Sequence, residues 1–302
     1  MKISRIIVWQ GYAWSRSPTV IVQEGQFEQN SRKGVDAFEA LVDSIRSALD
    51  RDAVTSMNRT GIRPKTPKNK VEMTYRGSFH SIRALAGVST ADFYSTVAEV
   101  MKAICPYPRY KIVSPVHDIE SITATQFAEI SRNNILTGCV GCGDDWLCTI
   151  KAPSSKAVSD VSAFFQVTIS VTASIPREWY CFSPPSKVAD SVTFKKWPLF
   201  EVISKLTFGY YVIADNAYPL SSSVLAPFTK PEIKSSEYSD YNLYQSQLRI
   251  RIEMAVGLLV NKWQLFKRPL SVDYCNSGLV IKTCMKLHNY CIDERIGRAR
   301  QW

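Results

Sequence analysis

The sequence has no apolar segment long enough to cross a bilayer. Its longest uninterrupted aliphatic run extends from Ala255 to Val260, whereas a membrane-spanning helix needs about 20 apolar residues. The first residues, from Met1 to Arg16, contain neither a sustained apolar segment nor a small-residue cleavage site of the kind found in secretory leaders. These two absences argue against a membrane protein and against a secreted one, so we expect an intracellular protein.

Regularly spaced cysteines, internal repeats and low-complexity tracts are also missing. The eight cysteines follow no regular spacing along the 302 residues, which favours reduced and mostly buried thiols over a disulfide framework. Hydrophobic residues make up 45% of the chain and charged residues 21%, as in an ordinary globular protein. A zinc site remains an alternative use for the residues Cys139, Cys142, Cys284, His288 and Cys291.

Acidic residues are the scarcer charge, because 27 Asp or Glu oppose 37 Lys or Arg and leave a net charge of +10. Before residue 110 the excess lies between Arg59 and Arg83, where Glu72 is the lone acidic residue among basic ones. Such a segment is typical of phosphate contact or nuclear import, although a solvated basic loop is the alternative. The candidate DNA-contacting residues are Arg63, Lys65, Lys68, Lys70, Arg76 and Arg83.

Helical patterns dominate the N-terminal region, which we place at residues 1–110. One helix is expected over Val35 to Leu49. Residues 79–104 show two helical patterns around the turn signal that starts at Gly87, with Ser89 or Thr90 as the cap of the second helix. A short helix, a turn and a second helix form the arrangement that lays one helix in a DNA groove. We therefore expect a mainly helical domain with a helix-turn-helix.

From residue 111 the pattern changes to a mixed α/β domain that extends to residue 302. β-branched and aromatic residues predict three consecutive strands at 138–152, 163–173 and 178–183, and a buried strand at 209–214. Helices are expected within 190–204, interrupted by Pro198, after Pro219, and most clearly at 246–266. The polar stretch before that last helix, with Lys234 and its tyrosines, is expected to be a loop, and a nucleic-acid-binding surface is the alternative. Together these elements predict a mixed sheet covered by helices.

Three acidic residues occupy positions where a buried carboxylate needs compensation. Asp144 interrupts the first strand, Asp215 ends the fourth, and Glu253 lies one residue off the apolar stripe of the long helix. Each acid taken alone is better explained as a surface or capping residue. If the three converged at one sheet edge, they would repel one another unless Mg²⁺ or Mn²⁺ lay between them. Their order, with the third acid on a helix, is the layout of a ribonuclease H-like nuclease, and Gly257 is expected to let that helix approach the sheet closely.

Four blocks of sequence surround these acids or follow them. The block from Gly138 to Pro153 matches G-C-x-G-x-x-D-G-T-H-x-x-I-K-A-P in part, and the block from Tyr211 to Leu220 is similar to L-x-G-D-S-x-Y-P-L. The block from Arg251 to Gly257, with Trp263 downstream, is similar to R-x-x-x-E-x-x-F-G, and the block from Leu287 to Cys291 is similar to L-H-N-x-C. In this order the blocks resemble the Harbinger-type transposases and their domesticated nuclease relatives, which belong to the DDE endonuclease superfamily.

The resemblance implies a ribonuclease H-like endonuclease or transposase. In that family, Asp144, Asp215 and Glu253 would hold divalent Mg²⁺ or Mn²⁺ ions, and a metal-bound water would attack the DNA phosphodiester. The resemblance also implies DNA as the substrate, a Myb-like protein as a partner, and the nucleus as the location, with the cytoplasm as a second one.

The sequence departs from the family pattern at several positions. Asp145 replaces a glycine, Trp146 and Leu147 replace a Thr-His pair, and Ala189 replaces the histidine of a weaker match that continues to Phe194. These departures keep a second hypothesis open, namely a catalytically inactive, domesticated factor that binds DNA or a protein. The oligomeric state, including a homo-oligomer, is also left open.

Overall fold

The computed structural model describes most of the chain from Val35 onward. The described residues are 35–61, 63–75, 87–110, 120–149, 164–171, 179–182, 198–270, 272 and 274–299. They fall into two compact units, one formed by Met1–Lys111 with Asp293–Trp302 and the other by Ile112–Ile292. Each unit is described by itself below. None of the described helices is long and apolar enough to cross a membrane.

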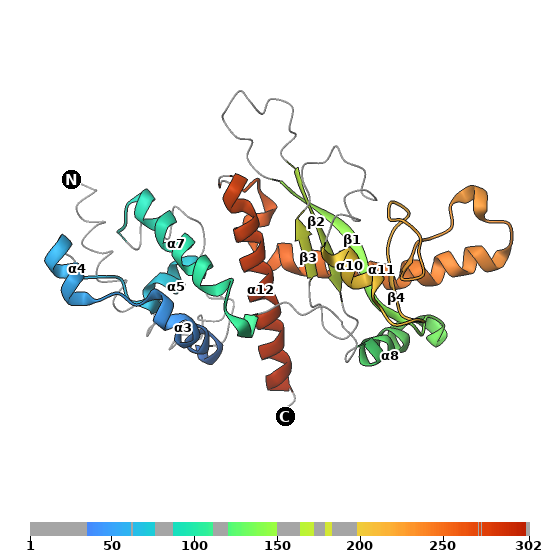
Figure 1. The fold of residues 1–302 in the computed structure, drawn as a ribbon, viewed down its shortest axis with the longest axis horizontal. Coiled ribbons are helices and arrows are strands. Elements are labelled where there is room, and N and C mark those ends of the chain that lie inside the picture. Colours follow the sequence, from blue (N-terminus) through green and yellow to red (C-terminus); the bar gives the residue numbers. More distant parts are fainter. Residues whose placement is uncertain are drawn as a thin grey trace, which may run out of the picture. The chain divides into compact units, whose positions relative to one another are not determined.

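The described part of the N-terminal unit is built around three helices that pack against one another. They are α3 (Val35–Leu49), α5 (Pro67–Tyr75) and α7 (Thr90–Ile104), shown in Figure 1. Apolar residues recur on one face of α3, where Phe38, Leu41 and Ile45 are buried, because residues three and four apart lie on the same side of a helix. The helix expected over Val35–Leu49 is thus confirmed to the residue.

Local signals explain where the shorter helices begin and end. Ser89 caps α7 by accepting a hydrogen bond from the N–H of Asp92 at 3.1 Å, so the predicted cap of this helix is confirmed. The first helix of the predicted helix-turn-helix lies outside the described residues, and the motif stays a prediction. Helix α4 (Ala53–Thr60), which the pattern did not predict, ends at Gly61 with φ 67°, a backbone conformation that favours glycine.

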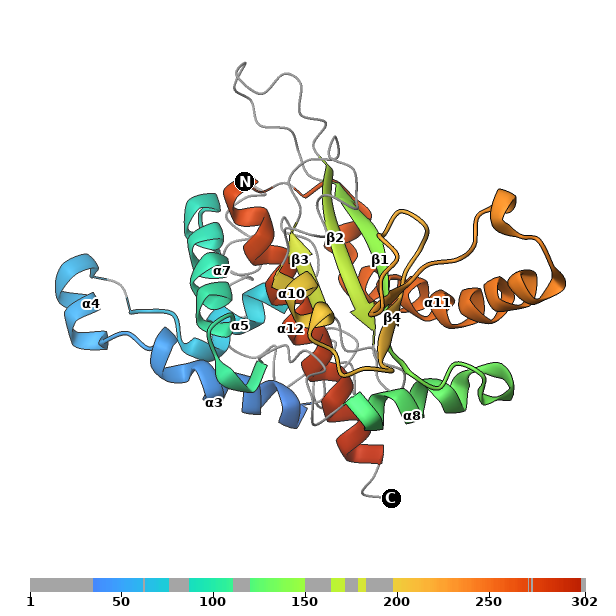
Figure 2. The ribbon, with the colours of Figure 1, turned by 45° about the vertical axis from the view of Figure 1, so that its right-hand side comes forward.

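Five described strands form one mixed sheet in the order β3-β2-β1-β4-β5. The strands β1 (Cys139–Thr149), β2 (Phe164–Val171) and β3 (Trp179–Phe182) form an antiparallel meander, seen side by side in Figure 2. The strands β4 (Tyr211–Ile213) and β5 (Val224–Leu225) continue the sheet from the other edge of β1, and both run parallel to it. The predicted meander of three strands and the fourth strand are confirmed.

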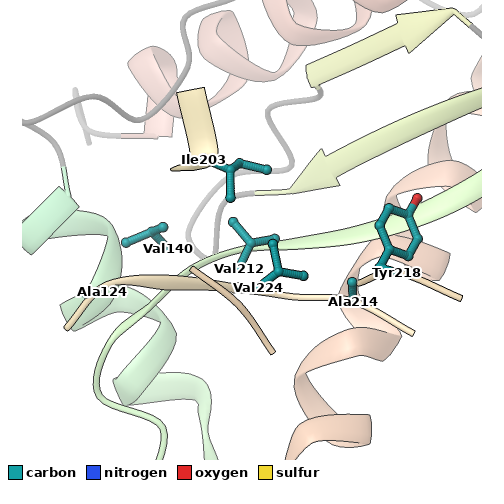
Figure 3. Packing of buried hydrophobic residues seen from close by; sticks show 7 residues of the cluster. All are labelled: Ala124, Val140, Ile203, Val212, Ala214, Tyr218 and Val224. Carbon is teal, nitrogen blue, oxygen red and sulfur yellow. The ribbon is translucent and has the colours of Figure 1, made fainter. Parts of the chain in front are cut away.

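Helices pack against this sheet, and an apolar cluster holds part of this helical layer in place. Helix α8 (Glu120–Ile130) packs against β1, and α11 (Ser236–Lys262) packs against β1, β2 and β4. Figure 3 shows the cluster close up. Its buried members come from α8, the strands β1, β4 and β5, α10 (Pro198–Ser204) and the turn after β4: Ala124, Val140, Ile203, Val212, Ala214, Tyr218 and Val224.

Two of the expected helices differ from the structure. Helix α10 begins at Pro198, because the first helical position has no intrahelical partner for an N–H and tolerates proline; residues 190–197 of the expected helical segment lie outside the described residues. The helix expected directly after Pro219 is not formed, because residues 219–223 lead instead into strand β5.

Helix α11 also differs from its prediction, because it begins at Ser236, ten residues before the expected start, so Tyr238, Tyr241 and Tyr244 lie on the helix and not in a loop. Figures 1 and 2 show the first part of α11 projecting past the ends of the strands.

Close packing at the start of β1 depends on a glycine. A Cβ atom on Gly138 would lie 2.0 Å from the carbonyl oxygen of Gly209, which is backbone and cannot swing away. Gly257 differs, because a Cβ atom there would meet nothing within 4 Å. The expectation that Gly257 lets α11 approach the sheet is therefore wrong.

Candidate functional site

The parallel pairing of β1 with β4 brings two of the three predicted acids next to each other. Cys142 of β1 is paired with Ile213 of β4, and a Cβ atom on the following Gly143 would lie 3.8 Å from the Cβ of Ala214. One residue further along each strand come Asp144 and Asp215. Because neighbouring strands lie about 4.8 Å apart, the backbones of these two acids are adjacent.

Asp215 holds the turn that follows β4. Its Oδ1 atom accepts a hydrogen bond from the N–H of Ala217 at 2.9 Å, and its carbonyl oxygen accepts one from the N–H of Tyr218 at 3.3 Å. Tyr218 belongs to the buried cluster beneath the sheet. Asp215 therefore has the capping role that was the alternative reading of this acid, and this role fixes where its carboxylate lies.

Helix α11 is attached to both strands just before their acids. The buried Gln245 donates a hydrogen bond through Nε2 to the carbonyl oxygen of Ala214 at 2.7 Å. The Cys142 thiol donates to the carbonyl oxygen of Leu248 at 3.4 Å. These two contacts, about one helical turn apart, hold α11 beside both strands, and the residues that follow on the helix lie near the acids.

The next turn of α11 places an arginine between two of the predicted acids. Nη1 of Arg249 lies 3.0 Å from Oδ2 of Asp144, and Nη2 of the same guanidinium lies 3.0 Å from Oε1 of Glu253. The Asp144 and Arg249 side chains are 22% and 28% exposed, and Glu253 is 51% exposed. A single cation thus joins a carboxylate from the strand to one from the helix.

The donor chemistry of the site suits a hard divalent ion. Three carboxylates offer the oxygen ligands that Mg²⁺ and Mn²⁺ prefer, and two of them already converge on one positive group. In the described part of the chain, however, no three acidic, cysteine or histidine side chains are grouped closely enough to hold a metal ion together. The described geometry joins Asp144 to Glu253 through Arg249 and leaves Asp215 beside them by strand register.

Sequence reasoning missed Arg249, although its signal is present. The spacing R-x-x-x-E is satisfied by Arg249 and Glu253, whereas Arg251 lies only two residues before the acid. Residues four apart share one face of a helix, so the spacing alone pairs Arg249 with Glu253. The contact between Arg249 and Asp144 could not be predicted from the spacing, because it depends on how α11 packs against β1. Gln245 was also missed, because a buried glutamine inside a polar stretch has no distinguishing local pattern.

The neighbouring thiols do not support the zinc alternative. Cys139 and Cys142 are fully buried, and a hydrogen bond with Cys139, followed by burial, raises the pKa of the Cys142 thiol well above its ordinary value. Zinc binds the thiolate form, which this setting disfavours. The last of the four sequence blocks lies on α12 (Tyr274–Ala299), where Leu287, His288 and Cys291 are buried.

In the basic segment, the structure gives three of the candidate DNA-contacting lysines acidic partners within their own unit. Lys65 pairs with Asp92 at 2.6 Å, and Lys68 pairs with Glu39. Lys70 is buried and donates to the carbonyl oxygen of Leu49 at 2.7 Å and to a carboxylate oxygen of Glu99 at 3.0 Å.

The other candidates of this segment differ in their setting. Arg63 is exposed, while Arg76 and Arg83 lie outside the described residues. DNA contact by this segment stays a prediction.

Comparison with known proteins supports the nuclease reading at the level of the superfamily. Residues 159–289 match the family model described as DDE superfamily endonuclease. The match includes Asp215, Arg249 and Glu253 and begins after Asp144. Neither a curated protein nor a solved structure matches the chain.

Proposed function

We propose that the protein is a divalent-metal-dependent DNA endonuclease of the transposase type, with Asp144, Asp215 and Glu253 as its acidic site. The observation that carries the proposal is the strand register, because it brings Asp144 and Asp215 side by side from segments separated by a crossover. Helix α11 then adds Glu253 through the shared contact with Arg249. A ribonuclease H-like arrangement of a mixed sheet and helices is part of this proposal.

Each acid has a distinct way of being positioned. Asp144 lies on β1 two residues after Cys142, and the thiol of Cys142 is hydrogen bonded to α11. Asp215 is oriented by the turn that it caps. Glu253 is carried by a helix whose buried face, including Leu248 and Ile252, is packed in the unit. When bound, Mg²⁺ or Mn²⁺ would neutralise charge on a phosphodiester and supply a nucleophile at neutral pH, and the three carboxylates are its proposed ligands.

The decisive experiment measures nicking of supercoiled DNA with and without divalent ions. Asp144→Asn and Asp215→Asn are expected to abolish divalent-dependent nicking and to leave salt-sensitive DNA binding intact, because phosphate contacts come from basic side chains. Asp240→Asn is the matched control, since Asp240 is an exposed acid on α11 and lies outside the site. Equal cutting by the wild type and the two site variants would refute the assignment of the site.

A second function is favoured by one observation. Arg249 already occupies the place between Asp144 and Glu253 and compensates part of their charge, as it would in a descendant that binds DNA or a protein without cutting. A thermal shift with Mn²⁺ separates the two functions. A stabilisation that disappears in Glu253→Ala supports the nuclease, and no stabilisation of the wild type supports the non-catalytic factor.

The proposed partners follow from the same function. DNA is the substrate, and the N-terminal unit, with exposed Arg63 in its basic segment, is proposed to contact it. A Myb-like protein is the proposed partner, and the nucleus, with the cytoplasm as a second location, is the proposed site of action.

A further inference from the structure

We infer that Arg249 is a built-in counter-cation that the divalent ion must displace from Asp144 and Glu253 before the acidic site is occupied. The inference rests on the proposed metal-dependent function and concerns the control of that same site. It starts from the two contacts of one guanidinium, each 3.0 Å long, with acids that come from different elements.

The charge balance of the site favours replacement of the guanidinium by a divalent ion. Arg249 brings one positive charge to a pair of carboxylates, and Asp215 adds a third acid beside Asp144 by strand register. The guanidinium therefore compensates only part of the negative charge. A divalent ion offers more charge in a smaller volume, so it competes for the same oxygen atoms.

Simultaneous occupation by both cations is unfavourable. The Nη1 and Nη2 atoms of Arg249 lie against oxygen atoms of Asp144 and Glu253, and these are the atoms that would coordinate a metal ion. Two cations held against the same carboxylates repel each other. Metal binding therefore requires the guanidinium to leave at least one of the two acids.

Arg249 can leave without disturbing the helix that carries it. The backbone of α11 is held by the buried Gln245 and by packing of Leu248 and Ile252. The guanidinium and Glu253 lie at the accessible side, with side chains 28% and 51% exposed. A long side chain rotating into solvent breaks two ion pairs and leaves the packed face unchanged.

The exchange makes a prediction with an unusual direction. Replacing Arg249 by glutamine removes the competitor, so Mn²⁺ should bind more tightly than in the wild type, by about 5- to 150-fold, which is the usual range for two coupled equilibria. The same variant should be less stable without metal, since it loses both ion pairs of the guanidinium. A merely structural arginine would instead lose affinity on removal.

The test is a titration of the full chain with Mn²⁺, followed through the paramagnetic signal of the free ion, together with thermal unfolding in its absence. Arg251→Gln is the matched control, because Arg251 is the same residue type on the same helix and pairs with neither acid; its replacement removes one positive charge but neither ion pair, so its Mn²⁺ affinity should rise far less than that of Arg249→Gln. Arg249→Lys keeps the charge without the two-pronged geometry and should give an intermediate affinity.

The outcomes separate this inference from the proposed function. Tighter Mn²⁺ binding by Arg249→Gln, or by Arg249→Lys if the glutamine variant does not fold, than by a wild type that itself binds Mn²⁺ supports the exchange. Unchanged or weaker binding by the variants, with a wild type that binds, overturns the exchange and leaves the metal-dependent function standing. No Mn²⁺ binding by the wild type overturns the proposed function and the exchange with it, whatever the Arg249 variants bind.

Discussion

The hydrogen bond from Gln245 to the carbonyl oxygen of Ala214 offers a direct test of how α11 is attached to the site. Gln245→Leu keeps a side chain of similar length but leaves this carbonyl without its 2.7 Å donor. Gln245 is 1% exposed, so water is a poor substitute. A buried polar group that loses its partner costs about 1–3 kcal/mol, and a loss of about 2 kcal/mol lowers the melting temperature by roughly 4–8 °C in a unit of this size.

The assay is urea and thermal unfolding of the full chain, followed by circular dichroism. Gln247→Leu serves as the control, because Gln247 is the same residue type two positions away on α11 and is only half-buried; its effect should stay within about 0.5 kcal/mol. Since Ala214 directly precedes Asp215, Mn²⁺ affinity should also fall in Gln245→Leu alone. If the two variants were equally stable and bound Mn²⁺ equally, the attachment of α11 to β4 described above would be refuted.

Two further predictions concern single positions with matched controls. Gly138→Ala should destabilise the protein by about 3 kcal/mol through overpacking against backbone, since the added Cβ would lie 2.0 Å from a carbonyl oxygen, whereas Gly257→Ala should stabilise it by about 0.5–1 kcal/mol as an unhindered helical substitution; equal effects in denaturant unfolding would contradict the close packing at β1. Lys70→Met should cost about 2 kcal/mol at pH 7, and Lys68→Met, whose ion pair is about 40% exposed on each side, at most about 0.5 kcal/mol. Burial opposes ionisation of Glu99, but hydrogen bonds from Lys70 and a neighbouring arginine hold its pKa below the ordinary 4.5. This stabilisation is present at neutral pH and is lost as the pH falls through the lowered pKa, so the deficit of Lys70→Met should shrink on acidification below about pH 4.5. A deficit that stays constant with pH would exclude Glu99 as the partner that matters.

Much of the fold could be predicted because local patterns and tertiary packing agree there. The helix over Val35–Leu49 has its apolar residues on one face, and Ser89 caps α7 in the expected way. The sequence pattern gave a wrong expectation where burial is decided by contacts between helices. Helix α5 contains Lys70 and Glu72, which read as solvated charges but are buried, because the lysine has partners supplied by other helices.

The early start of α11 has a similar cause. Its first turns carry polar and aromatic residues without an apolar stripe. In the structure, these residues contact the loop that precedes the helix. Asn242 accepts the N–H of Phe228 at 2.8 Å and donates to its carbonyl oxygen at 2.9 Å, while the Phe228 ring contacts Tyr238 and Tyr241 edge-on. These contacts join residues ten or more positions apart, which a helical periodicity cannot reveal.

The candidate site could be predicted in its parts and not in its assembly. The order of Asp144, Asp215 and Glu253 suggested one site, but the adjacency of the first two depends on parallel pairing between strands separated in sequence by the rest of the meander and α10. The role of Arg249 depends on the rotation of α11 about its axis, which brings the arginine to Asp144. Neither relation is encoded in the spacing of the acids.

The attachments of α11 also bear on which changes in length the chain can tolerate. Gln245, Leu248 and Arg249 each contact a strand at a defined height, and one residue inserted after them would turn Glu253 by about 100° around the helix axis. Insertions between Arg249 and Glu253 would thus remove the acid from the site without unfolding the helix. Additions before Gln245 would merely lengthen the part of α11 that projects past the strands. Related chains that keep this site should therefore vary in length in the loop before α11 and remain invariant in length from Gln245 to Glu253.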